Sequence, residues 1–234
     1  MTTIAANLQK VRDRIAAACA AAQRNPQEVT LLAVSKTFGA DAVRAAAEAG
    51  QRAFGENYIQ EAIEKMALLS HLPLKWHCIG PIQSNKTRLV AGHFDWAHTV
   101  DRLKIAQRLS EQRPEQLPAL NVCIQVNIDG GPNKAGVPPQ EALALAREVA
   151  RLPRLSLRGI MTIPEPSEDF TMQKNVHLRA RALFDELRAA GLPLDTLSMG
   201  MTADLEAAVA AGTTMVRVGT AIFGGRPAAL SRQN

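Results

Sequence analysis

The sequence has little of several features that mark common classes of protein. Phenylalanine, tryptophan and tyrosine make up only 4% of its 234 residues, and the basic residues are scattered despite a formal charge of +5. Nucleic-acid-binding surfaces combine clustered basic side chains with stacking aromatics, so we expect no nucleic acid partner. No apolar run is long enough to span a bilayer, and no basic segment followed by an apolar one begins the chain, so we expect no membrane partner.

Residues that bind metals or form disulfides are also scarce. The three cysteines, Cys19, Cys78 and Cys123, are far apart and lack the paired spacing of a zinc site or a disulfide framework. His93 and His98 do not form a helix-spaced metal pair. We therefore expect reduced thiols in a cytoplasmic protein without a bound metal.

The chain does contain a regular alternation of short apolar segments and helical patterns. Continuous apolar runs, such as VTLLAV at residues 29–34, indicate strands that are buried on both faces. The expected strands cover residues 29–34, 52–54, 75–79, 94–99, 121–127, 157–163, 196–200 and 214–218. Strands that alternate with helices are typical of an α/β protein with a parallel sheet.

Two α/β architectures fit this alternation, a closed barrel and an open doubly wound sheet. No G-x-G-x-x-G turn follows the first strand, which argues against a dinucleotide-binding sheet. Eight strands, in a chain of the roughly 200–250 residues that a barrel needs, favour a TIM-type (β/α)8 barrel. We expect one domain over residues 1–234, with an extra N-terminal helix that covers one end of the barrel.

The stretch 196–224 predicts a site for a phosphate group. It contains a strand that ends in Ser198-Met199-Gly200, a helix over 202–211, and a strand that runs into Gly219-Thr220. Small hydroxyl and glycine residues let backbone N–H groups approach an anion, and a helix N-terminus adds positive dipole. In TIM barrels the phosphate site often lies after the last two strands.

Lys36 follows the first buried strand directly, which places it at the mouth of the predicted barrel. Partial desolvation at such a position makes a lysine amine a better nucleophile, and the alternative is a solvated lysine at a strand end. A nucleophilic lysine near a phosphate site indicates a Schiff base to a phosphorylated carbonyl compound. Pyridoxal 5′-phosphate (PLP) and the substrate of a sugar-phosphate aldolase both qualify.

Arg217 helps to distinguish these possibilities. The alternation of the last strand puts Arg217 and Gly219 on the face opposite Val216 and Val218. An arginine inside a barrel keeps its charge, so it needs a carboxylate, a phosphate or a pyridine nitrogen as its partner. Guanidinium only donates, so a ring nitrogen bonded to it stays unprotonated, which disfavours aminotransferase-type chemistry.

Five motifs together resemble the pyridoxal phosphate homeostasis protein family. They are LLAVSKTF around Lys36, FGENYIQE at 54–61, KWHCIGPIQSNK at 75–86, RGIM at 158–161, and SMGMT with TMVRVGTAIFG within 198–224. The similarity covers nearly the whole chain. It implies a single-domain barrel resembling the N-terminal domain of alanine racemases, with PLP held as a Schiff base on a lysine.

The resemblance also implies roles for seven cofactor-binding residues. These are Lys36 for the Schiff base, Arg217 for the pyridine nitrogen, Asn57 and His77 along the ring, and Ser198, Gly219 and Thr220 for the phosphate. Two positions depart from the family pattern. Thr202-Ala203-Asp204 stands where Ser-Asp-Asp is common but keeps a hydroxyl and an acid, and Cys78 stands where phenylalanine is usual, which affects packing more than cofactor binding.

The function implied by the resemblance is intracellular PLP homeostasis, in which the protein supplies or buffers PLP with little or no turnover. Apo PLP-dependent enzymes are then the expected acceptors, and Lys134 is a candidate for a role in transfer. An amino-acid racemase is the alternative, but two-base racemisation needs a second acid/base, which racemases of this barrel type draw from a C-terminal domain and a partner subunit. This chain continues only about ten residues past Gly224. A sugar-phosphate aldolase is disfavoured by Arg217 and the motifs, and we expect a monomer.

Overall fold

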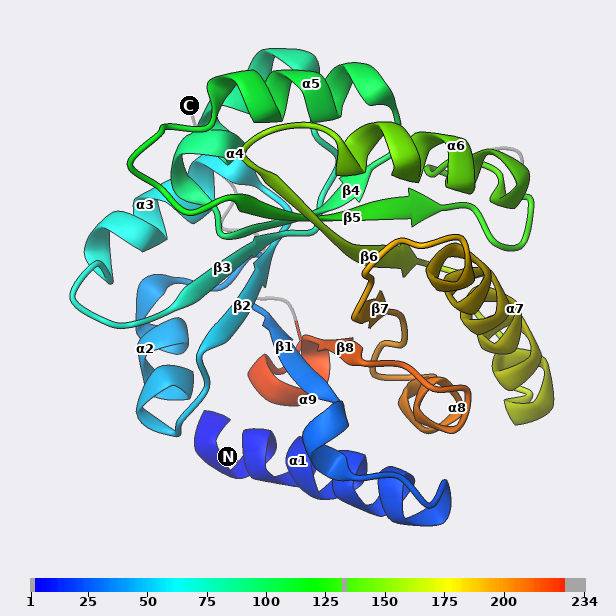
Figure 1. The fold of residues 1–234 in the computed structure, drawn as a ribbon. Coiled ribbons are helices and arrows are strands. Elements are labelled where there is room, and N and C mark those ends of the chain that lie inside the picture. The colour runs from blue at the N-terminus through cyan, green and yellow to red at the C-terminus, as the bar shows by residue number, and fades with distance from the viewer. Residues whose placement is uncertain (1–2, 132–133, 226–234) are drawn as a thin grey trace.

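Strands and helices alternate along the chain, and the strands form a closed barrel. The computed structural model describes residues 3–131 and 134–225 (Figure 1). Within these ranges the strands are β1 (Thr30–Val34), β2 (Ala53–Glu56), β3 (Lys75–Cys78), β4 (Trp96–Val100), β5 (Leu120–Val126), β6 (Leu155–Thr162), β7 (Thr196–Ser198) and β8 (Met215–Val218). They pair in parallel in chain order, and β8 pairs with β1, so the predicted TIM-type (β/α)8 barrel is confirmed.

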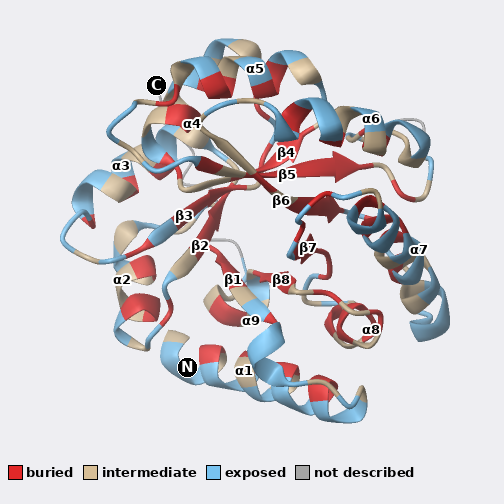
Figure 2. Ribbon diagram, in the orientation of Figure 1, coloured by how far each residue is buried: buried red, intermediate tan, exposed pale blue. Residues whose placement is uncertain are grey.

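The helices form a layer around the barrel (Figure 1). They are α1 (Ile4–Ala21), α2 (Ala40–Glu48), α3 (Ile59–Leu68), α4 (Thr87–His93), α5 (Leu103–Gln112), α6 (Pro139–Ala150), α7 (Phe170–Ala189), α8 (Leu205–Ala210) and α9 (Thr220–Phe223). Figure 2 shows that the strands are largely buried and that buried residues form one side of most helices. This is the pattern expected of parallel strands covered by amphipathic helices. Within the described residues, no helix is both long and apolar enough to cross a membrane.

The N-terminal helix α1 does not cover an end of the barrel, so that prediction was wrong. Its buried face packs against α8, α9 and α2, which places it in the outer layer of helices. Arg14 of α1 forms an ion pair with Glu206 of α8 at 2.9 Å, and Asn7 donates to the carbonyl of Ile222 in α9 at 3.1 Å. Because α9 has a single turn, the long α1 covers the side of the barrel that a helix after β8 would otherwise cover.

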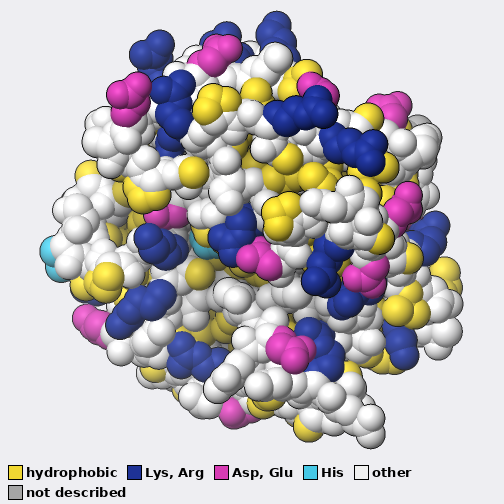
Figure 3. Space-filling view, in the orientation of Figure 1, with side chains coloured by type: hydrophobic (Ala, Val, Ile, Leu, Met, Phe, Trp, Pro, Cys, Tyr) yellow, Lys and Arg dark blue, Asp and Glu magenta, His cyan; other side chains and the backbone are white. Residues whose placement is uncertain are grey.

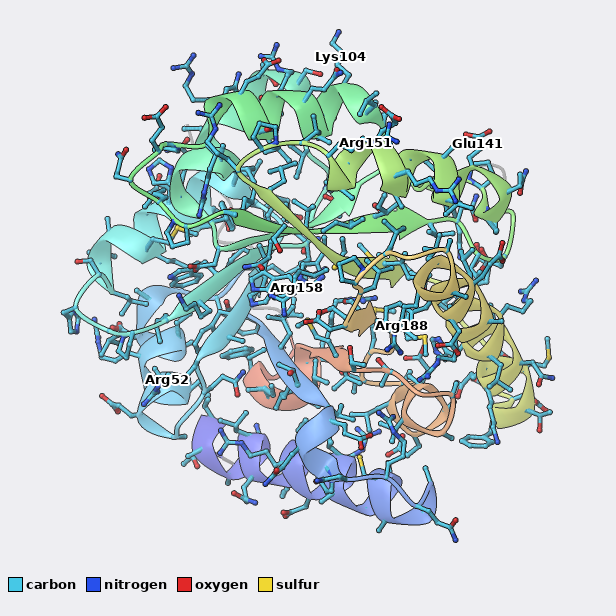
Figure 4. All side chains as sticks on the ribbon, viewed as in Figure 1. Arg52, Lys104, Glu141, Arg151, Arg158 and Arg188 are labelled. Atoms are coloured by element: carbon cyan, nitrogen blue, oxygen red, sulfur yellow. The ribbon has the colours of Figure 1, made fainter. Side chains whose placement is uncertain are left out.

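The amino-terminal end of the barrel is closed by a stack of side chains. The guanidinium of Arg158 on β6 lies 4.9 Å from the centre of the Trp96 ring. The His77 ring also stacks on Trp96, with 5.1 Å between the ring centres. Asp195 pairs with Arg158 at 2.6 Å, and Figure 4 places Arg158 near the middle of the barrel in this view. On the same face, basic and acidic side chains are interspersed (Figure 3). The opposite, carboxyl end of the barrel is therefore the end that offers space for a ligand.

Candidate functional site

A cavity of about 350 Å³ lies at the carboxyl ends of the strands. Its lining residues come from the carboxyl ends of six strands and the segments that follow them: Val34, Lys36, Thr37, Phe38, Asn57, Ile79, Ile163, Met201, Thr202, Ala203, Arg217, Gly219, Thr220 and Gly224. The structure thus brings together Lys36, Asn57, Arg217, Gly219 and Thr220 from the residues predicted by sequence. His77 and Ser198 are buried and are not part of this lining.

Lys36 sits in a tight turn directly after β1. The N–H of Phe38 donates to the carbonyl of Ser35 at 3.1 Å, and the N–H of Ser35 donates to the carbonyl of Gly55 at 3.0 Å. Thr37 has a φ of +68°, in the left-handed region that β-branched residues rarely adopt. Backbone strain of this kind persists where the surroundings hold it, often at functional sites. The turn fixes the backbone from which Lys36 reaches into the cavity.

A buried ion pair supports this turn from below. Lys65 of α3 donates to Glu56 Oε1 at 2.8 Å and to the carbonyl of Ser35 at 2.9 Å. The Ser35 hydroxyl donates to the same Glu56 oxygen at 2.6 Å. Burial raises the pKa of Glu56, and the charge and hydrogen bond of Lys65 act against that shift. The pair therefore ties β1, β2 and α3 together one residue away from Lys36.

Arg217 is buried and contacts only neutral acceptors among the described residues. Its Nη1 donates to Ser198 Oγ and its Nη2 to the carbonyl of Thr162, both at 2.8 Å. Burial lowers the pKa of Arg217 to about 10, which still leaves the guanidinium charged at neutral pH, and the charge of Asp204 acts against the shift. A guanidinium has five N–H groups, so donors remain for a group bound in the cavity.

Two histidines extend this hydrogen-bonded chain through the barrel interior. His98 Nδ1 lies 3.2 Å from Ser198 Oγ, and His98 Nε2 lies 2.9 Å from His77 Nδ1. Burial lowers the pKa of His77 to about 3 and that of His98 well below its usual value, so both rings are neutral at physiological pH. The hydroxyl of Ser198 is thus engaged by Arg217 and His98 rather than directed at the cavity.

The segments after β7 and β8 form the small-residue wall of the cavity. A Cβ on Gly219 would lie 3.1 Å from the carbonyl oxygen of Val34, so the chain after β8 passes close to the end of β1. As first residues of α9, Thr220 and Ala221 have N–H groups without partners inside that helix. Thr202 and Ala203 face the same cavity from the segment after β7. These groups can surround an anion.

The segment 201–204 is fixed by a half-buried acid. Asp204 Oδ1 accepts from the N–H of Met201 at 2.6 Å, and Oδ2 lies 2.8 Å from His177 Nε2 on α7. Burial alone would raise the pKa of Asp204, but the hydrogen bonds from His177 and Met201 lower it overall. Because this acid holds 201–204 as a turn, α8 starts at Leu205 rather than at the predicted residue 202.

Asn57 offers an unused polar atom at the cavity. Its Oδ1 is buried without a hydrogen-bond partner among the described residues. The N-cap of α3 is Tyr58, so Asn57 lies one residue outside that helix terminus. A Cβ on Gly80 would lie 2.3 Å from the Asn57 carbonyl, so the segment after β3 packs directly against this residue. The Asn57 amide oxygen is available to accept from a ligand.

Lys134 lies near the rim of the cavity, but its amine is already engaged. It pairs with Asp129 at 2.9 Å and Glu165 at 3.2 Å, and it donates to the carbonyl of Ile163 at 3.1 Å. Ile163 itself lines the cavity. Any part that Lys134 takes in transfer would first require these bonds to break.

Sequence reasoning missed part of the lining and the residues behind it. The apolar contributors Phe38, Ile79, Ile163 and Met201 lie in loops whose course no pattern reveals. Thr202 belongs to the SMGMT motif, but nothing in the sequence assigns its hydroxyl to the cavity. His98 stands alone among its neighbours, and Lys65 is one of several polar residues in its helix, so no spacing marks either of them. No group of His, Cys, Asp or Glu that could hold a metal ion occurs in the part of the chain that the structure describes.

Comparison with known proteins gives consistent matches along the chain. Residues 4–227 match the family described as "Alanine racemase, N-terminal domain". The chain is 59% identical to the pyridoxal phosphate homeostasis protein of Pseudomonas aeruginosa over 97% of each chain. It is 54% identical to the Escherichia coli protein of that name, over 97% of this chain and 98% of the other.

Solved structures give the same result. The structure of PipY from Synechococcus elongatus with PLP bound aligns with a TM-score of 0.82 and 39% identity, covering 95% of this chain and 100% of that one. An alanine racemase of Clostridium difficile aligns with a TM-score of 0.72 and 17% identity, over 86% of this chain and 54% of that one. The likeness to the racemase extends to the fold alone.

Proposed function

Because the chain belongs to the alanine racemase N-terminal domain family and, within it, to the pyridoxal phosphate homeostasis proteins, we propose that it binds PLP in the cavity at the barrel mouth. It would buffer or supply the cofactor inside the cell with little or no turnover. The observation that carries this proposal is that Lys36 and Arg217, on neighbouring strand ends, line one cavity together with Gly219 and Thr220.

Each chemical group of PLP has a fitting partner among the lining residues. The aldehyde would condense with the Lys36 amine to a Schiff base and release water. Arg217 would donate a remaining N–H to the pyridine nitrogen, and the buried Oδ1 of Asn57 would accept from the ring substituents. The phosphate would lie against Thr202 and the backbone of Gly219-Thr220.

Two of the seven cofactor-binding residues suggested by the sequence take a different role in this proposal. Ser198 Oγ accepts from Arg217 and is hydrogen-bonded to His98, so we assign it to positioning Arg217 rather than to the phosphate. His77 lies behind His98 and would act on the ring only through that chain. Thr202 takes the hydroxyl role at the phosphate.

The few ionisable residues in the cavity support the proposal that the protein has little or no catalytic turnover. Among the described lining residues, Lys36 and Arg217 are the ionisable ones, and a two-base racemisation needs an additional acid/base on the opposite face of the substrate. An arginine at the ring nitrogen keeps that nitrogen unprotonated, which weakens the electron sink that PLP supplies when bound. An amino-acid racemase remains the second candidate, because alanine racemases share the fold.

We propose that apo PLP-dependent enzymes accept the cofactor and that the protein acts as a monomer.

We also place the protein in the cytoplasm. Its three cysteines are free and buried, in agreement with a reducing compartment.

The test is the visible absorption spectrum of purified protein loaded with PLP, recorded before and after borohydride. We expect a yellow band that borohydride bleaches, with the cofactor fixed to the peptide that contains Lys36. Lys36→Ala should lack the band, while Lys104→Ala, which removes an exposed lysine of α5 (Figure 4), should keep it. Equal labelling of the Lys36→Ala variant would refute the assignment, and amino-acid racemisation by the wild type would favour the second candidate.

A further inference from the structure

Four buried polar side chains form one line across the barrel, and the line ends at the cavity. It runs from His77 on β3 to His98 on β4, then to Ser198 on β7 and Arg217 on β8. Strands β4 and β7 are not neighbours, so the contact between His98 and Ser198 crosses the interior. TIM barrels usually fill this space with layers of branched apolar side chains. A polar line here therefore needs a reason.

The positions of the protons in this line follow from elementary hydrogen bonding. A neutral imidazole has one donor and one acceptor, a hydroxyl has one donor, and Arg217 can only donate. Since Arg217 Nη1 donates to Ser198 Oγ, the Ser198 hydroxyl is free to donate to His98 Nδ1. His98 then carries its proton on Nε2 and donates it to His77 Nδ1.

The opposite arrangement satisfies fewer groups. If His98 Nδ1 carried the proton, it would donate to the same Ser198 oxygen as the guanidinium. The Ser198 hydroxyl hydrogen would then need another acceptor, and the described residues offer Ser198 Oγ only His98 and Arg217. That arrangement also directs two positive N–H dipoles at one oxygen. In the first arrangement each bond polarises the next in the same direction, which strengthens the chain.

We propose that His98 is a positioning residue for Arg217: as its Nε2–H tautomer it orients the Ser198 hydroxyl, and the oriented hydroxyl holds the guanidinium toward the cavity. This inference rests on the proposed function, because it concerns how Arg217 is presented to the ring nitrogen of PLP. Loss of the His98 acceptor would free the hydroxyl to rotate. The guanidinium would then lose one of its two fixed acceptors, with the Thr162 carbonyl as the other.

The first experiment tests the tautomer without any ligand. Protein labelled with ¹⁵N-histidine is examined by NMR between about pH 6 and pH 8, the range in which an unperturbed histidine titrates. His98 is assigned by the loss of its signals in His98→Asn. We expect a protonated Nε2 and an unprotonated Nδ1 on His98 at every pH in this range. A proton on His98 Nδ1, or a cationic His98, would overturn the proposal.

The second experiment measures PLP affinity and the absorption spectrum of variants. His98→Leu should bind PLP about 10-fold more weakly, equivalent to about 1.4 kcal/mol at 25 °C. His98→Asn keeps an acceptor at the Nδ1 position, so we expect it to recover most of that loss. Ser198→Ala should weaken binding as much as His98→Leu does, and the double variant should be no weaker than either, because both changes break the same link.

The controls separate this inference from the proposed function. His93→Leu changes an exposed histidine and should leave affinity and spectrum unchanged. If the wild type fixes no PLP on Lys36 after borohydride, the proposed function fails, whatever the tautomer. If the wild type does so and a folded His98→Leu binds PLP with unchanged affinity and spectrum, the positioning role fails. If His98→Leu does not fold, His98→Asn, Ser198→Ala and the wild-type tautomer still decide.

Discussion

The buried pair of Lys65 and Glu56 gives the sharpest prediction about stability. Replacement of Lys65 by methionine keeps the length and apolar part of the side chain and removes the charge. It leaves the Glu56 carboxylate, which is fully buried, with only the Ser35 hydroxyl as a hydrogen-bond donor. The other carboxylate oxygen, Oε2, already has no partner among the described residues. Breaking a buried pair from one side costs about 3–5 kcal/mol.

The double variant Glu56→Gln/Lys65→Met should recover most of this loss. Glutamine is the same size as glutamate, carries no charge and still offers an oxygen to the Ser35 hydroxyl. Removal of both charges eliminates the desolvation cost of a lone buried ion, so the double variant should lie within about 1–2 kcal/mol of the wild type. Non-additivity of this size identifies the pair, rather than the packing of Lys65 alone, as the cause.

The cost of Lys65→Met should depend on pH with a definite sign. Burial raises the pKa of Glu56, and the loss of Lys65 removes the main opposing influence. An acid whose folded pKa is raised holds more protons in the folded state, so stability falls as pH rises above its usual value of 4.5. The variant should therefore be closest to the wild type below about pH 4.5 and fall furthest behind at pH 8.

The assay is urea unfolding followed by circular dichroism at several pH values. An unchanged slope with denaturant would confirm that only stability has changed. Lys104→Met alters an exposed lysine and should cost less than about 0.5 kcal/mol. A Lys65→Met variant within about 1 kcal/mol of the wild type at pH 8, or with a cost independent of pH, would refute the reasoning.

Two further substitutions test the walls of the cavity. Gly219→Ala places a Cβ 3.1 Å from the Val34 carbonyl oxygen, so it should weaken PLP binding about 10-fold and cost about 1–3 kcal/mol of stability. Titration with PLP and urea unfolding measure these two effects. Gly92→Ala, which has open space around it, should change neither binding nor stability. Asp204→Asn should cost about 1–3 kcal/mol at pH 7, because the carboxylate accepts from Met201 and His177. Since the pKa of Asp204 is lowered from 3.8, its contribution to stability is fully present above that pH and is lost as the pH falls below it. The difference between wild type and variant in unfolding experiments should therefore shrink as the pH falls below 3.8.

The barrel could be predicted because its signals are local. Apolar runs such as the one at 29–34 place each strand within a few residues, and the expected strand at 94–99 becomes β4 at Trp96–Val100. Helix α3 shows the limit of the same method. The spacing of Ile59, Ile63 and Met66 predicts one apolar face for this helix, but the residues that the structure buries are Ala62 and Lys65. A lysine is buried here only because Glu56, from another element, accepts a hydrogen bond from its ammonium group and balances its charge.

The position of α1 could not be predicted for a similar reason. Its apolar face was clear from Leu8, Val11 and Ile15, but periodicity does not say which surface covers that face. The surface that α1 covers is left open because α9, which follows β8, is only a single turn. This uncovered side of the barrel exists only in the assembled fold.

In the site, too, some residues could be predicted from local sequence signals and others depend on contacts made only in the fold. Lys36, Gly219 and Thr220 directly follow strands, and chain position alone brings the ends of parallel strands to one face. The role of Ser198 depends instead on which direction a hydroxyl takes, and His98, 100 residues away, decides that. Side chains that act through a partner on another strand leave no spacing in the sequence.

Three cations near the barrel mouth differ in how their charges are balanced. Lys65 has the carboxylate of Glu56, so its charge is used within the fold. Arg217 has only a hydroxyl and a carbonyl as acceptors, and among the described residues no acid pairs with Lys36 or Arg217. A buried cation without a counter-ion is costly, and an anion bound in the cavity removes part of that cost. The cavity therefore favours a ligand that carries negative charge, as the phosphate of PLP does.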